Sequence, residues 1–175
     1  MPYAINIRTD NESAMQIREL WRLASSFEAS PSMEDMNYPP HITVAVYDEI
    51  AEQVLVSALR IGFEGKPKFT VRFVHLGYFE TANSIVLWAA PVVPQSLRSA
   101  VQAIHEYVGA TLCRPSYRPG SWVPHCSLAL SVNLKRRDEA LAFANTPIAA
   151  FEVVFDVADC AAFHPVMVLQ ECPLT

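Results

Sequence analysis

The sequence predicts an α+β fold with two similar lobes, each made of an antiparallel-type sheet backed by helices, facing each other across a central cleft. Three observations support this prediction. Short segments of alternating apolar and polar residues are interleaved with amphipathic segments of helical period. The order of these elements repeats once along the chain, which predicts a pseudo-twofold arrangement. Each repeat contains one strand that opens with Pro-His.

The first half of the chain contains six expected elements. In chain order they are a strand over 3–8, a helix over 12–27, a strand over 41–48, a helix over 50–62 and two strands over 68–79 and 84–93. Residues 3–8 alternate as a strand does, and Leu20, Trp21 and Ala24 lie at helical spacing after the helix cap that we expect at Asn11. A polar segment flanked by prolines separates the helix from the next strand.

The second half repeats this order. Its expected elements are a helix over 95–110, a loop of Arg, Pro, Gly and Ser over 113–121, a strand near 125–132, a short helix over 136–145 and two strands over 150–160 and 166–172. In both halves a long helix leads through a proline-containing loop into a Pro-His strand, followed by a second helix and two strands. We therefore predict one bilobal domain over residues 1–175, with its site between the lobes.

The two Pro-His strands share a motif. The sequence PPHITVAV begins at residue 39 and VPHCSLAL at residue 123, so both have the form Pro-His-x-Thr/Ser followed by aliphatic residues. Side chains at positions i and i+2 of a strand point to the same face. His41 should therefore face the same way as Thr43, and His125 the same way as Ser127.

These residue types suit the cleavage of a phosphodiester. The reaction needs a base for the attacking oxygen and an acid for the leaving oxygen, and two imidazoles can hold complementary protonation states near neutral pH. The hydroxyls of Thr43 and Ser127 can donate hydrogen bonds to the non-bridging oxygens, where negative charge develops. Neither motif has an adjacent Asp or Glu, so we expect no metal site and no cofactor.

The paired motifs resemble those of the 2H phosphoesterase superfamily, which includes bacterial 2′-5′ RNA ligase-like proteins and RNA 2′,3′-cyclic phosphodiesterases. The resemblance covers essentially the whole chain and implies the bilobal pseudo-twofold 2H fold with one motif in each lobe. It matches His41 and Thr43 to the first motif and His125 and Ser127 to the second. It also implies that His41 acts as the acid and His125 as the base.

Substrate contacts are expected in the loop before the second motif. Arg114, Tyr117, Arg118 and Trp122 interleave guanidinium groups with aromatic rings, which can hold a phosphate and stack on a base. Many RNA-acting members of the superfamily carry an arginine soon after the second motif, whereas residues 128–131 here are Leu-Ala-Leu-Ser. This loop is the expected replacement for that arginine.

The remaining candidates have ordinary structural interpretations. We predict structural roles for His75, His105 and His164, with His75 the most suitable of the three to line the cleft. Cys126 follows His125 directly and should face the opposite side of the strand, in the core, so the two cannot form a nucleophilic dyad. Residues 135–137, Lys-Arg-Arg, should form a solvated helix start.

Composition limits the partners and the location. The net charge of −5 gives no overall field for a long polyanion, so a nucleotide or a short RNA end is expected as substrate. No stretch of about 18 apolar residues and no secretory signal is present, so we expect a monomeric, cytoplasmic protein without membrane contact. The four cysteines form no CxxC pair, which predicts reduced, buried thiols at Cys113, Cys126, Cys160 and Cys172.

The leading hypothesis is a metal-independent phosphodiesterase that hydrolyses a 2′,3′-cyclic phosphate or a 2′-5′ phosphodiester, with 2′-5′ RNA ligation as the reverse reaction. A non-catalytic module that binds a nucleotide or an RNA end is the alternative, and it predicts affinity without turnover. A structural adaptor is a third hypothesis, and it predicts that replacing the histidines changes stability alone. The residues of both motifs are complete, which favours catalysis.

Overall fold

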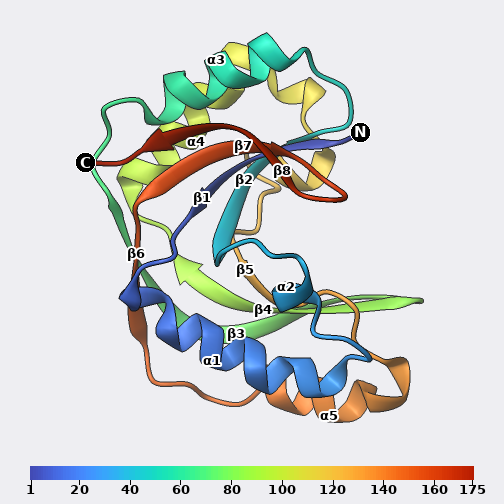
Figure 1. The fold of residues 1–175 in the computed structure, drawn as a ribbon. Coiled ribbons are helices and arrows are strands. Elements are labelled where there is room, and N and C mark those ends of the chain that lie inside the picture. The colour runs from blue at the N-terminus through green and yellow to red at the C-terminus, as the bar shows by residue number, and fades with distance from the viewer.

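The computed structural model describes residues 1–175 as two four-stranded antiparallel sheets with helices on their outer faces (Figure 1). In spatial order, the strands of the first sheet are β2 (His41–Tyr47), β1 (Tyr3–Arg8), β7 (Val157–Ala162) and β8 (Met167–Pro173). Those of the second sheet are β5 (Cys126–Ala129), β4 (Ser84–Val92), β3 (Phe69–Thr81) and β6 (Phe151–Phe155). The predicted α+β class and pair of antiparallel sheets are confirmed.

Two pairs of helices cover the outer faces of the sheets (Figure 1). The helices are α1 (Met15–Ala24), α2 (Ser32–Asp35), α3 (Glu52–Phe63), α4 (Gln95–Val108) and α5 (Arg137–Ala144). Helices α1 and α5 contact the second sheet, while α3 and α4 pack on each other and α3 contacts the first sheet. Helix α1 follows a strand of the first sheet but contacts the second, whereas α4 follows a strand of the second sheet and packs on α3.

Five short 3₁₀ helices complete the elements. They are η1 (Glu12–Ala14), η2 (Ser25–Phe27), η3 (Ala110–Leu112), η4 (Pro115–Tyr117) and η5 (Leu134–Arg136). The helix predicted over 12–27 therefore begins and ends with 3₁₀ turns. Its predicted cap is confirmed, because the Ser13 amide donates to Asn11 Oδ1 over 3.0 Å.

Two predicted strands differ from the structure. The strand predicted over 150–160 is two strands in different sheets, since β6 ends at Phe155, β7 begins at Val157 and Asp156 joins them. Apolar alternation continues through this junction, so the pattern gives no sign of the change of sheet. The strand predicted near 125–132 is shorter, with β5 confined to four residues directly after His125.

The hydrophobic core extends across both sheets. One cluster of 39 buried residues includes Ile5 and Val44 of the first sheet and Leu87 and Phe155 of the second. The sheets are therefore joined by shared packing as well as by the connecting chain. All four cysteines are free and buried, as predicted. None of the helices has the length and apolar character that crossing a membrane requires.

Candidate active site

The two motif strands, β2 and β5, are edge strands of different sheets and contact each other. Two tryptophans donate hydrogen bonds to carbonyls of these strands. The Trp21 indole N–H donates to the Ser127 carbonyl over 2.9 Å, and the Trp122 indole N–H donates to the Thr43 carbonyl over 3.1 Å. Trp122, in the loop before β5, therefore ties the second motif to β2, while Trp21 attaches β5 to α1, which contacts the same sheet.

Both motif histidines are oriented by the same device. His41 Nδ1 lies 2.9 Å from the Pro39 carbonyl oxygen, and His125 Nδ1 lies 2.7 Å from the Val123 carbonyl oxygen. In each motif a proline separates the acceptor from the histidine and favours an extended backbone at the acceptor residue. Because a carbonyl only accepts, Nδ1 carries the proton in both rings and Nε2 is left for a substrate.

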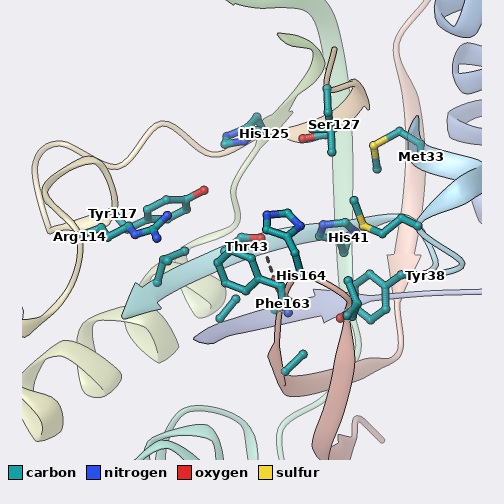
Figure 2. A pocket seen from close by; sticks show the side chains of 17 residues that line it. Met33, Tyr38, His41, Thr43, Arg114, Tyr117, His125, Ser127, Phe163 and His164 are labelled. Atoms are coloured by element: carbon teal, nitrogen blue, oxygen red, sulfur yellow. Dashed lines mark hydrogen bonds between the residues drawn. The ribbon is translucent and has the colours of Figure 1, made fainter. Parts of the chain in front are cut away.

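A cavity of about 180 Å³ brings the two motifs together. In Figure 2, His125 and Ser127 lie on one side of it, with His41 and Thr43 on the other. Seventeen residues line it: Ala4, Asn6, Met33, Met36, Tyr38, His41, Thr43, Val46, Arg114, Tyr117, His125, Ser127, Leu130, Ala161, Phe163, His164 and Val166. All four predicted motif residues thus share one cavity.

Burial lowers the pKa of both histidines. Loss of solvent is the main cause at His41 and at His125, and the backbone hydrogen bonds to their Nδ1 atoms oppose it. At His41 the carboxylate of Asp159 also raises the pKa, while His125 and Arg8 lower it. His125 is therefore close enough to His41 to disfavour its protonated form.

A buried hydrogen-bond network supports Thr43. Its hydroxyl donates to Asn6 Oδ1 over 2.8 Å, and Asn6 Nδ2 donates to Asp159 Oδ1 over 3.2 Å. The Asp159 carboxylate also accepts from the Tyr38 hydroxyl over 2.7 Å and from Arg8 Nε over 2.6 Å. An ionised carboxylate only accepts, so Asn6 must turn its amide nitrogen to Asp159 and its oxygen to Thr43. The network therefore fixes the direction of the Thr43 proton.

The two motif hydroxyls consequently differ. The Thr43 proton points to Asn6, so this hydroxyl must rotate before it can donate to a ligand in the cavity. Ser127 also lines the cavity, and no side chain or carbonyl of the protein accepts a hydrogen bond from its hydroxyl. Ser127 is therefore the readier hydrogen-bond donor to an anion.

Two of the predicted substrate residues, Arg114 and Tyr117, line the cavity. Arg114 Nε donates to Asp48 over 2.9 Å, and its guanidinium carbon lies 5.8 Å from the centre of the Phe163 ring. This ion pair is exposed to solvent, so it costs little to exchange for a ligand phosphate. Tyr117 is half-buried beside it, and burial raises the pKa of its phenol.

The other two predicted substrate residues do not reach the cavity. Arg118 turns back onto its own loop, where Nε donates to the Cys113 carbonyl and Nη2 to the Thr111 carbonyl, each over 2.9 Å. Trp122 packs against the core and uses its only N–H on the Thr43 carbonyl. Both residues shape the site by holding the loop and the strand edge. Their spacing in the sequence could not reveal which way they point.

His164 is a third histidine of the cavity that sequence reasoning missed. It lies on the turn between β7 and β8 and lines the cavity with its neighbour Phe163 (Figure 2). The sequence favours His75 as the additional histidine of the cleft, but His75 is exposed on β3 and does not line the cavity. The position of His164 depends on how the closing hairpin packs, for which the local sequence carries no signal.

Cys126 lies in the core, where the strand pattern predicts it. Cys126 is fully buried, and burial raises the pKa of its thiol to about 12, which leaves it protonated and poorly nucleophilic. No group of three or more His, Cys, Asp or Glu side chains is arranged to hold a metal ion. The cavity therefore offers imidazoles, hydroxyls and one guanidinium as its chemical groups.

The sequence profile of the 2′-5′ RNA ligase superfamily matches residues 9–161, a range that contains both motifs. The chain belongs to this superfamily. It is thus a 2H phosphoesterase, as the resemblance of its paired motifs implied. No curated protein matches the chain.

Solved structures share the fold of this 2H phosphoesterase over nearly its whole length. LigT of E. coli, complexed with NADP⁺, is 14% identical with a TM-score of 0.60 and covers 99% of this chain and 96% of its own. TT0787 of Thermus thermophilus is 18% identical with a TM-score of 0.61, and the match covers 99% of this chain and 98% of TT0787. Usb1 of Kluyveromyces marxianus, with uridine monophosphate, is 13% identical with a TM-score of 0.50, and the match covers 99% of this chain and 97% of Usb1.

Proposed function

We propose that this 2H phosphoesterase hydrolyses a 2′,3′-cyclic phosphate or a 2′-5′ phosphodiester, in an RNA end or a small nucleotide, by general acid-base catalysis. The observation that carries the proposal is the matched orientation of His41 and His125. Both rings are fixed through Nδ1, and both motifs line one cavity. A phosphate bound between them would meet an imidazole Nε2 on either side.

The proposed reaction on a cyclic phosphate has one displacement at phosphorus. His125 Nε2 takes a proton from water as the water oxygen bonds to phosphorus. One ring P–O bond breaks, and His41 returns a proton from Nε2 to the leaving ribose oxygen, so a phosphomonoester is the product. The same steps with a ribose 5′-hydroxyl in place of water would form a 2′-5′ linkage, and the reverse of those steps would cleave it and regenerate the cyclic phosphate.

Hydrogen bonds stabilise the charge that develops on the non-bridging oxygens. The Ser127 hydroxyl donates directly, and the Thr43 hydroxyl donates after it rotates away from Asn6. The Arg114 guanidinium, at the edge of the cavity, adds positive charge. None of these groups requires a metal ion for its part in the reaction.

Asp159 gives the two motif histidines different electrostatic surroundings. Asp159 raises the pKa of His41 and has no such effect among the causes that shift His125. A negative group near one imidazole favours the protonated form of that ring. Arg8 and His125 oppose this effect by lowering the pKa of His41. We therefore take His41 as the proton donor and His125 as the proton acceptor in the hydrolytic direction from the superfamily resemblance.

The ligands of the structural neighbours agree with a nucleotide substrate. LigT was crystallised with NADP⁺ and with 3′-AMP, and Usb1 with uridine monophosphate. These ligands all combine a phosphate with a nucleoside. We propose that this protein, too, binds a short nucleotide.

The proposal is tested with purified protein, nucleoside 2′,3′-cyclic phosphates and excess EDTA. We expect phosphomonoester formation by the wild type, and a loss of about 10²- to 10⁴-fold in kcat for His41→Ala and for His125→Ala. Circular dichroism and thermal unfolding of each variant control for folding. Tight nucleotide binding without turnover by the wild type would instead support the non-catalytic binding module.

A further inference from the structure

A second groove adjoins the cavity on the side of His125. It has a volume of about 390 Å³ and shares Tyr117, His125, Ser127 and Leu130 with the cavity. Phe79, Val86, Ser116, Ser121 and Val123 complete its lining. His41 lines only the first cavity, so a molecule with its phosphate between the histidines can extend past His125 into this groove.

The volumes indicate how a substrate divides between the two spaces. Pockets that enclose small molecules usually measure about 300–1,000 Å³. The first cavity, at about 180 Å³, is below this range, and the phosphate occupies part of it. The groove, at about 390 Å³, is within the range. The larger organic part of the substrate therefore has its best place beyond His125.

The lining of the groove suits a nucleoside. The ionisable side chains of the groove are the imidazole of His125 and the phenol of Tyr117. Apart from His125, the groove therefore offers no positive charge to a second phosphate. The hydroxyls of Ser116 and Ser121 can both donate and accept, which suits ribose or the edge of any base. Phe79 is 37% exposed at the groove and can provide a stacking surface.

Packing holds Phe79 beside the catalytic centre. Its ring centre lies 5.0 Å from that of His125, edge to face, and 5.0 Å from that of Trp88. Trp88 lies across Gly77, where a Cβ atom would come within 2.4 Å of the indole ring. Glycine at position 77 therefore leaves room for the Trp88 indole on β3, where it packs against Phe79.

Phe163, the phenylalanine of the first cavity, is less available than Phe79. The Arg114 guanidinium carbon lies 5.8 Å from the centre of the Phe163 ring and covers one of its faces. We therefore propose that the nucleoside that carries the cyclic phosphate binds in the groove beyond His125, with its base stacked on Phe79. This inference rests on the proposed function for its phosphate position and goes further by assigning the place of the base.

The test compares two cyclic phosphates, adenosine 2′,3′-cyclic phosphate and glycerol 1,2-cyclic phosphate, which has no base. For Phe79→Ala we expect the ratio of kcat/KM between the adenosine and the glycerol substrate to fall about 5- to 150-fold, the range that base stacking on an aromatic ring gives. Phe79→Trp should preserve the ratio, because the indole also provides a stacking surface. The ratio removes any effect of the substitution on His125 that both substrates share.

The matched control is Tyr78→Ala. Tyr78 is 38% exposed, lies next to Phe79 on the same strand and lines neither space. For Tyr78→Ala we expect the ratio of kcat/KM between the adenosine and the glycerol substrate to equal that of the wild type. A wild-type ratio in Phe79→Ala would overturn the inference, and so would a fall in the ratio for Phe163→Ala in place of Phe79→Ala.

Failure of the proposed function gives a different result. If the wild type hydrolyses neither substrate, the catalytic proposal is wrong and the groove is tested by binding alone. Titration calorimetry with adenosine 2′-monophosphate should then show a dissociation constant about 5- to 150-fold higher for Phe79→Ala than for Tyr78→Ala, again the stacking range. Equal affinities of the two variants would overturn the inference.

Discussion

At the scale of single residues, the motif histidines are held in one tautomer by the chain that precedes them. His41 and His125 each donate from Nδ1 to a carbonyl two residues earlier, across a proline. Each ring is also partly removed from water, which lowers its pKa. The free protein at neutral pH therefore carries two neutral imidazoles, whereas the proposed reaction needs one of them protonated.

This difference predicts an acidic optimum for kcat/KM, which reports the groups of the free enzyme. Because both histidine pKa values lie below the ordinary 6.5, the optimum of kcat/KM should lie below pH 6.5 and activity should fall as pH rises. Bound phosphate is negative and raises both pKa values, so the optimum of kcat should lie at higher pH. Initial rates across a pH series give both profiles.

The exposed cavity histidine provides the control for this profile. His164→Gln removes the third imidazole and should keep the position of the kcat/KM optimum, because His164 is not one of the two locked rings. A kcat/KM optimum above about pH 7 in the wild type would contradict the assignment of this pH dependence to His41 and His125.

At the scale of elements, α2 and its flanking loop form one wall of the cavity through Met33 and Met36. The carboxylate of Glu28 ties this wall to the end of β5. It accepts from the amides of Leu130 and Ser131 over 3.0 and 2.8 Å. It also accepts from the amide and hydroxyl of Ser32 at the start of α2, over 3.1 and 2.6 Å. One side chain thus joins the second motif strand to the loop before the first.

Glu28→Ala should lower the free energy of unfolding by about 1–3 kcal/mol, because it leaves several backbone amides without their charged acceptor. Activity should also fall, since the cavity wall loses its attachment. Urea unfolding and kcat/KM measure the two effects. Glu34→Ala, on the exposed side of α2, is the matched control and should change stability by less than about 0.5 kcal/mol. Equal stability of the two variants would show that Glu28 anchors nothing.

At the scale of the whole molecule, the site lies where segments from both ends of the chain meet. Asp159 of β7 is fully buried and accepts from Arg8 and Asn6 of β1 and from Tyr38 of the loop before β2. The network continues through Asn6 to the hydroxyl of Thr43. The first sheet and the first motif therefore depend on a carboxylate near the C-terminus.

Asp159→Asn keeps the shape of this side chain but leaves the largely buried Arg8 without its main counter-charge. We expect a loss of about 3 kcal/mol and a fall in Tm of about 6–12 °C. Differential scanning calorimetry measures this change. Glu171→Gln is the control because Glu171 pairs with the same arginine from a half-exposed position, so its loss should cost less than about 1 kcal/mol. Similar Tm values for the two variants would refute a central role for Asp159.

The sequence by itself determined the elements and the motif residues. Alternation with a period of two predicts both a strand and the face that His41 shares with Thr43, because these properties depend on neighbouring residues alone. The same argument applies to His125 and Ser127, and it correctly separates Cys126 from them. The repeated order of helices and strands also predicted two sheets. These features require no knowledge of what lies across the fold.

Only the tertiary structure decided which distant groups meet. The change of sheet at Asp156, the inward position of His164, the outward turn of Arg118 and the exposure of Phe79 beside His125 all depend on packing between segments far apart in the chain. Backbone preferences and periodicity act over a few residues, whereas the bond between Asn6 and Asp159 spans 153 positions. Local pattern therefore identified the two motif histidines, and long-range packing decided the network that supports the first motif and the groove beside His125.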